Sequence, residues 1–157
     1  MNRRLTLLAL ALIPLMASAA GTHGGHGGGH PPNTGTPGNP AQVDHTVDVT
    51  MNDRMRFAPE QIQVKAGQTI RFAVTNTGQQ PHEMVIGPLD ELREHAEEMR
   101  RNPGMKHEEP NMLGLDGGET GEIVWRFASP GEVDFACLIP GHLEAGMKGT
   151  IDVRAGD

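Results

Sequence analysis

The sequence predicts an all-β protein, a Greek-key β-sandwich with a short helical insertion between strands and a disordered N-terminal tail. From Asp44 onward, short segments rich in Val, Ile, Phe and Thr alternate with Gly, Pro and Asn, which is typical of an antiparallel sandwich. One charged stretch, Leu89 to Arg101, is rich in Glu, Leu, Met and Ala instead, as expected of a helix. Residues 21–43 are mostly Gly, His, Pro, Thr and Asn, with too few apolar side chains to form a core.

The individual strands are expected where apolar and polar residues alternate. Ile62 and Val64, for example, are separated by glutamine and followed by lysine, so one face of that segment is apolar. The expected strands are His45 to Met51, Gln61 to Lys65, Thr69 to Thr75, His82 to Ile86, Gly121 to Ala128, Gly131 to Ala136 and Lys148 to Val153. The helix has Asp90 near its start and Pro103-Gly104 after its end, and it belongs to an insertion at about residues 88–118.

The first 20 residues predict a secretory signal peptide. Arg3 and Arg4 precede an apolar run from Leu5 to Met16, and Ala17-Ser18-Ala19 supplies small residues for cleavage. The run has about a dozen residues, fewer than the roughly 20 that a membrane-spanning helix needs. We therefore expect a periplasmic protein that is not membrane-embedded, with a leader at 21–43 and one domain at 44–157. The net charge of −7 argues against nucleic acid as a partner.

The strongest functional signal is the segment Cys137-Leu-Ile-Pro-Gly-His142-Leu-Glu-Ala-Gly-Met147. It places a thiol, an imidazole and a thioether five residues apart, and Pro140-Gly141 and Ala145-Gly146 are turn formers that can fold the three donors toward one centre. Cys137 is the only cysteine, so it cannot form an internal disulfide. Two imidazoles, a thiolate and a weak axial thioether are the ligands of a type 1 copper site.

The second imidazole is expected from His82, which follows Pro81 and opens an apolar strand. Taken singly, each residue has another interpretation: Cys137 as a small buried residue, His82 at a strand edge, His142 in a turn and Met147 as core filling. Their order, spacing and strand context together favour one type 1 site that cycles between Cu(I) and Cu(II). Zn(II) accepts the same nitrogen and sulfur donors and is the alternative metal.

These segments resemble the cupredoxins, the plastocyanin and azurin superfamily. The resemblance covers about Asp44 to Val153 and rests on Phe57-Ala-Pro59 with Ile62 to Gly67, on Pro81 to Ile86, and on Phe135 through Gly149. It implies two packed sheets with copper at one end. The helical insertion and the His-rich leader are similar to those of bacterial periplasmic copper-tolerance cupredoxins. The spacing within the ligand loop differs from some plastocyanin and azurin loops, so optical colour and reduction potential do not carry over.

Two further groups of side chains could bind copper. Thioether and imidazole donors recur in the insertion and imidazoles recur in the leader, and both suit copper. They are Met99, Met105, His107 and Met112 in the insertion, and His23, His26 and His30 in the leader. The alternatives are that the methionines fill gaps under the helix and that the leader is a linker.

Two functions are consistent with these features. The first is copper tolerance or homeostasis through binding and redox cycling of copper, and the leader and insertion favour it. The alternative is an electron shuttle between periplasmic redox proteins, with His142 as the exit and an apolar patch of Leu138, Ile139 and Leu143 for docking. We expect no enzymatic activity, because the sequence has no His-x-His pairs for a trinuclear copper site and a cysteine nucleophile would have no use for Met147.

Overall fold

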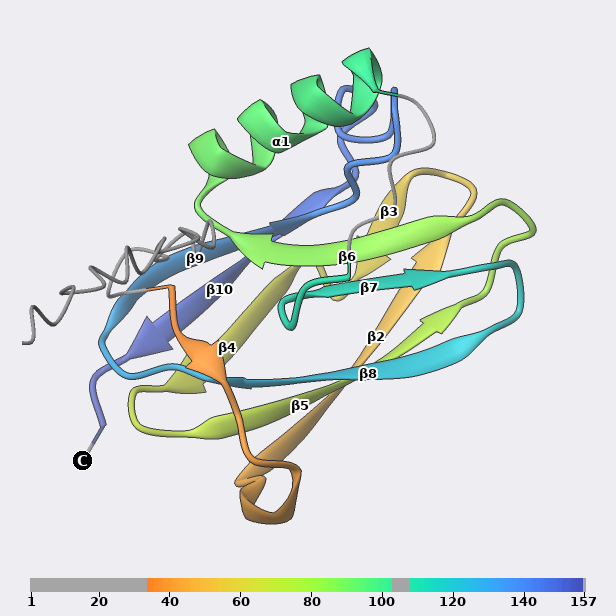
Figure 1. Cartoon of the computed structure of the whole chain (residues 1–157). Coiled ribbons are helices and arrows are strands. Elements are labelled where there is room, and N and C mark those ends of the chain that lie inside the picture. Colours follow the sequence, from red (N-terminus) through yellow and green to blue (C-terminus); the bar gives the residue numbers. More distant parts are fainter. Residues whose placement is uncertain (1–33, 103–107, 157) are drawn as a thin grey trace, which may run out of the picture.

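The computed structural model describes residues 34–102 and 108–156, which form two five-stranded sheets packed face to face (Figure 1). The first sheet has the order β1 (Thr36–Pro37), β8 (Thr120–Arg126), β5 (Thr69–Asn76), β2 (His45–Asn52) and β3 (Arg56–Ala58). The second has the order β4 (Gln61–Lys65), β10 (Lys148–Arg154), β9 (Gly131–Ala136), β6 (His82–Gly87) and β7 (Met112–Leu115). The predicted β-sandwich is therefore confirmed.

The sheets are mixed rather than purely antiparallel. β2 runs parallel to β5, and β4 runs parallel to β10, while the other paired strands are antiparallel. The chain leaves the first sheet after β3, forms β4 in the second and returns to the first as β5. This crossing between sheets brings strands that are distant in sequence next to each other, which local alternation of residues does not predict.

The main core lies between the two sheets and is built from the alternating apolar residues. Its largest fully buried side chains include Trp125, Phe57, Phe72, Phe127 and Phe135. The rings of Phe57 and Phe135 pack edge to face across the sheets, with centroids 4.9 Å apart. Fully burying one such side chain stabilises the fold by about 1.5–3 kcal/mol.

The helix α1 (Leu89–Arg101) has the bounds that the sequence predicts and lies over the outer face of the second sheet (Figure 1). Acidic residues in its first turn and Arg100 and Arg101 in its last turn complement the helix dipole. Its buried residue Leu92 packs with Val85, Ala136 and Leu138 in a smaller second cluster. Because the main core covers one face of β6 and this second cluster covers the other, all of β6 is buried.

Three parts of the structure differ from the sequence prediction. The predicted loop after the helix contains β7, an edge strand that pairs with β6, and β3 was not expected as a strand. The prediction that the disordered leader reaches residue 43 is wrong for residues 34–43. Trp125 Nε1 donates a 2.7 Å hydrogen bond to the carbonyl oxygen of Thr34, and β1 pairs with β8. These hydrogen bonds hold residues 34–43 against the first sheet, and the composition of the segment alone does not predict them.

Candidate metal centre

His82 is held inside the sandwich at the first position of β6. Its side chain is fully buried, and β6 pairs with β7 on one side and β9 on the other. The imidazole Nδ1 lies 3.3 Å from His142 Nδ1, and Nε2 lies 3.3 Å from Asp53 Oδ1 on the opposite side of the ring. Both ring nitrogens of His82 therefore have defined surroundings.

The other candidate ligands lie in the loop between β9 and β10, at residues 137–147. Backbone hydrogen bonds fold this ligand loop, and three of them are 3.0 Å long: Cys137 N donates to Met147 O, Met147 N to His142 O, and His142 N to Ile139 O. Gly141 and Gly146 both have φ of +92°, a conformation that favours glycine. The predicted turns are confirmed, and they return Met147 to the side of Cys137.

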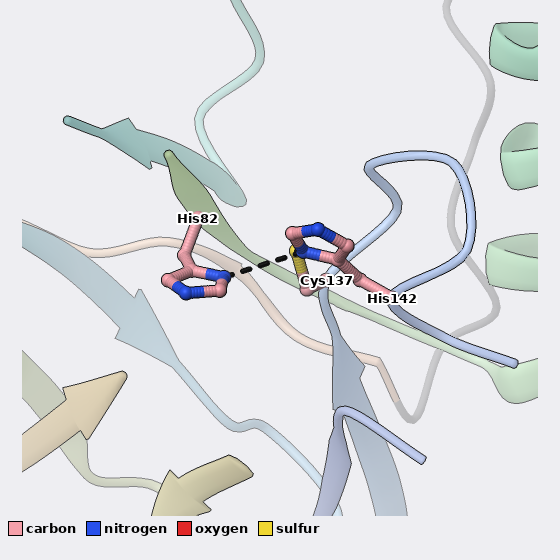
Figure 2. Close-up of side chains that lie close together, drawn as sticks. All are labelled: His82, Cys137 and His142. Atoms are coloured by element: carbon pink, nitrogen blue, oxygen red, sulfur yellow. Dashed lines mark hydrogen bonds between the residues drawn. The ribbon is translucent and has the colours of Figure 1, made fainter. Parts of the chain in front are cut away.

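Cys137, His82 and His142 converge on one point (Figure 2). One donor atom from each lies within 4.8 Å of the others, and His142 Nδ1 is 3.3 Å from Cys137 Sγ. The convergence follows from the sheet, because β6 and β9 are antiparallel and the start of β6 lies beside the end of β9. In residues 34–102 and 108–156, no other three histidine, cysteine or carboxylate side chains converge in this way.

The surroundings of Cys137 keep its thiol protonated in the absence of a metal ion. Burial raises the pKa of the Cys137 thiol to about 12, and desolvation followed by the nearby His82 lowers the pKa of His142. At neutral pH the thiol therefore keeps its proton and His142 is uncharged. The Glu83 N–H points at Cys137 Sγ from 3.5 Å and would stabilise a thiolate. A cation here would replace the thiol proton, and the two nitrogens and one sulfur fit copper.

Met147 is fully buried and packs in the main core together with Cys137. Its backbone is hydrogen-bonded to Cys137 and to His142. This position is compatible with a thioether ligand and also with core filling, the two interpretations that the sequence leaves open. Met147 as the axial ligand stays part of our proposal below.

Only Met99 and Met112 of the predicted second copper site lie in the described part of the chain. Met99 is half-buried on α1, and Met112 is half-buried against the second cluster, as expected of a methionine that fills a gap. Met105 and His107, and the leader residues His23, His26 and His30, lie outside the described residues. Copper binding by these side chains stays a prediction.

Sequence analysis did not identify two carboxylates beside the centre. Glu83 is buried on β6, and its Oε1 accepts a 2.9 Å hydrogen bond from the Leu138 amide in the ligand loop. Asp53 lies in the turn after β2, and hydrogen bonds from the amides of Gln79 and Gln80 lower the pKa of its carboxyl group. A charged residue within an apolar strand is a signal that could have identified Glu83, whereas an aspartate in a turn is too common to identify Asp53.

A β-sandwich that gathers two histidines and a cysteine where β6 begins and β9 ends has the architecture of the cupredoxin class. Comparison with known proteins agrees with this class. Residues 43–154 match the family described as copper binding proteins, plastocyanin/azurin family. The chain therefore belongs to this family of copper-binding proteins.

Several known proteins are similar to this chain. The copper-resistant cuproprotein CopI of Rubrivivax gelatinosus is 48% identical over 120 residues, which cover 76% of this chain and 73% of the relative. The CopI protein of Pseudomonas aeruginosa is 32% identical over 149 residues, covering 76% of this chain and 82% of the relative. Among solved structures, auracyanin from Roseiflexus castenholzii is 26% identical with a TM-score of 0.60, covering 71% of this chain and 98% of that chain.

Proposed function

We propose that the protein binds one copper ion at a type 1 site formed by His82, Cys137, His142 and Met147, and serves copper tolerance in the periplasm by binding and redox cycling of copper. The observation that carries this proposal is the convergence of two imidazoles and one thiol within 4.8 Å. In the described residues, no helix is long and apolar enough to cross a membrane. The proposal includes no enzymatic activity.

The ligand residues would contribute by staying in place. Copper, when bound, supplies one-electron chemistry between Cu(I) and Cu(II). His82 is fixed by β6, which is buried on both faces, and Cys137 is fixed by hydrogen bonds from its own amide to Met147 and from Glu83 to its sulfur. Because Cu(I) and Cu(II) favour different geometries, ligands that cannot move lower the rearrangement needed when an electron is transferred.

A role in copper tolerance is supported by two observations. The similar proteins of Rubrivivax gelatinosus and Pseudomonas aeruginosa are copper-resistant cuproproteins. The sequence also carries imidazole and thioether donors outside the type 1 site, in the leader and in the insertion, and an electron carrier needs neither. We propose that these segments add looser copper binding to the type 1 site.

An electron shuttle is the second candidate. His142 is half-buried rather than fully buried, and its neighbours Ile139 and Leu143 are also partly exposed. Leu138, the third residue of the predicted docking patch, is fully buried and cannot be part of that surface. An imidazole edge surrounded by apolar side chains suits a small and transient docking surface. This surface would transfer electrons to a redox protein without moving copper.

The ligand assignment is tested by the variant Cys137→Ser. The copper-loaded protein should have an intense visible absorption that depends on the copper–thiolate bond, and the variant should lose it completely because an alcohol does not replace the thiolate. Absorption spectra of both proteins, loaded with equal copper, measure this. Retained absorption in Cys137→Ser would refute the proposed site.

The two functions are separated by a deletion strain. We expect growth to fail on excess copper while respiration at ordinary copper stays normal, and we expect the wild-type gene to restore growth. A strain complemented with Cys137→Ser shows whether the type 1 site itself is needed. Normal growth on excess copper together with impaired respiration would favour the electron shuttle instead.

A further inference from the structure

A turn from the first sheet reaches the buried ligand His82 of the second sheet. Asp53 follows the last residue of β2, and its Oδ1 lies 3.3 Å from His82 Nε2. The His82 side chain is fully buried, whereas the side chain of Asp53 is 36% exposed. The partly exposed carboxylate of Asp53 thus contacts Nε2 of His82, while Nδ1 of the same ring faces the candidate metal centre.

The Asp53 carboxylate is itself held in place by the loop that leads into β6. The amide of Gln79 donates to both carboxylate oxygens, at 3.0 and 2.9 Å, and the amide of Gln80 donates to Oδ1 at 3.1 Å. Gly78 leaves room for this contact, because a Cβ at that position would collide with Asp53 Oδ1. The carboxylate is therefore anchored by the backbone just before His82, and its position does not depend on the metal.

This contact determines which nitrogen of His82 is available. A carboxylate accepts hydrogen bonds, so Nε2 must carry the proton and donate it to Asp53, and Nδ1 is left with its lone pair. Nδ1 is the atom that faces His142 Nδ1 at 3.3 Å. A negative partner on a ligating imidazole fixes the ring and makes it a stronger donor.

We propose that Asp53 is a positioning residue for the copper centre: it holds His82 as the tautomer that ligates through Nδ1, and its negative charge favours Cu(II) over Cu(I). This inference rests on the proposed copper site. His142 is half-buried and reaches the centre from the ligand loop, so Asp53 acts on one of the two imidazoles. The centre therefore has a lower reduction potential than it would have without this carboxylate.

Asp53→Asn tests the proposal, because it keeps the size of the side chain and an oxygen acceptor but removes the charge. Loss of such a partner lowers metal affinity about 10–100-fold. If the loss falls on Cu(II), the reduction potential rises by about 59 mV for each tenfold change. The matched control is Glu144→Gln, which removes one charge from the exposed residue two positions after His142. Potentials and Cu(II) affinities are measured for both variants and the wild type.

An equal rise in both variants, or no rise in Asp53→Asn, would overturn the proposal. A second measurement needs no variant: ¹⁵N chemical shifts of the metal-free wild type should show His82 protonated at Nε2 and unprotonated at Nδ1. The opposite tautomer would also overturn it. A wild type without copper-dependent visible absorption contradicts the proposed function, whereas normal wild-type absorption with an unchanged Asp53→Asn potential contradicts only the role of Asp53.

Discussion

The two imidazoles of the metal centre are supported in different ways. His82 belongs to β6, is fully buried and has a carboxylate behind it. His142 belongs to a loop of turns, is half-buried and depends on backbone hydrogen bonds and on glycines with positive φ. The difference indicates a division of roles in the proposed copper site: the strand holds one candidate ligand fixed inside the protein, and the loop holds a candidate ligand that solvent or a partner can reach.

The different roles of His82 and His142 are tested most directly by removing each imidazole in turn. We expect both His82→Gly and His142→Gly to lose the visible absorption of the copper-loaded protein. Added imidazole should restore it in His142→Gly, because that ring is partly exposed and its space opens to solvent. The same addition should fail in His82→Gly, because the side chain of His82 is fully buried. Absorption during imidazole titration measures the difference, and equal recovery would contradict the division of roles.

An effect of intermediate size is expected in the second cluster, because this cluster packs against both β6 and the ligand loop. Leu92 is 4% exposed and packs with Val85 of β6 and Leu138 of the ligand loop. Leu92→Ala should lower the free energy of unfolding by about 2–5 kcal/mol. Met99→Ala on the same helix is the control, and its effect should be smaller because Met99 is only half-buried. Chemical denaturation of the metal-free proteins measures both, and equal losses would show that Leu92 does not anchor the helix.

The smallest expected effect is the pH dependence of copper affinity, which should come from the Cys137 thiol and not from the His142 imidazole. With the pKa of Cys137 raised to about 12, the folded metal-free protein carries the thiol proton at neutral pH. Copper must displace this proton, so affinity should rise about tenfold for each unit of increasing pH. The lowered pKa of His142 means that this ring adds no further dependence at neutral pH.

Competition with a Cu(I) chelator at pH 6.5, 7.5 and 8.5 measures this slope. Wild-type affinities should rise steadily over the series after correction for the chelator's own protonation. A flat profile would show that the thiol has already lost its proton in the metal-free protein. A much steeper profile would show that a second ligand also releases a proton near neutral pH.

Much of the fold could be predicted from local patterns. The helix, β4 and β9 have the predicted bounds, and β2, β5, β6 and β10 each end one residue later than predicted. β8 begins one residue earlier and ends two residues earlier than predicted. Alternation in strands and the composition of a helix are properties of neighbouring residues, so they are visible in the sequence. β3 and β7 are short, with three and four residues, and their patterns were too brief to be distinguished from loop.

In the candidate metal centre, too, some residues could be predicted from local sequence and others could not. Cys137, His142 and Met147 lie within one loop, so their spacing and the turn formers between them predicted a common site. His82 required a strand placed beside that loop, and the antiparallel pairing of β6 with β9 provides it. The electron-shuttle hypothesis already expected an exposed His142, but the complete burial of His82 could not be predicted, because burial depends on what covers a residue rather than on the residue itself.

The sequence by itself determined the class of fold, the order and spacing of the candidate copper ligands, and the helix that follows the first of them. Only the tertiary structure decided that Asp53 contacts His82, that Glu83 accepts a hydrogen bond from the ligand loop, and that the Thr34 carbonyl accepts one from Trp125. These contacts join residues 29, 55 and 91 positions apart. Local preferences are a property of adjacent residues, whereas such contacts exist only after the two sheets have packed.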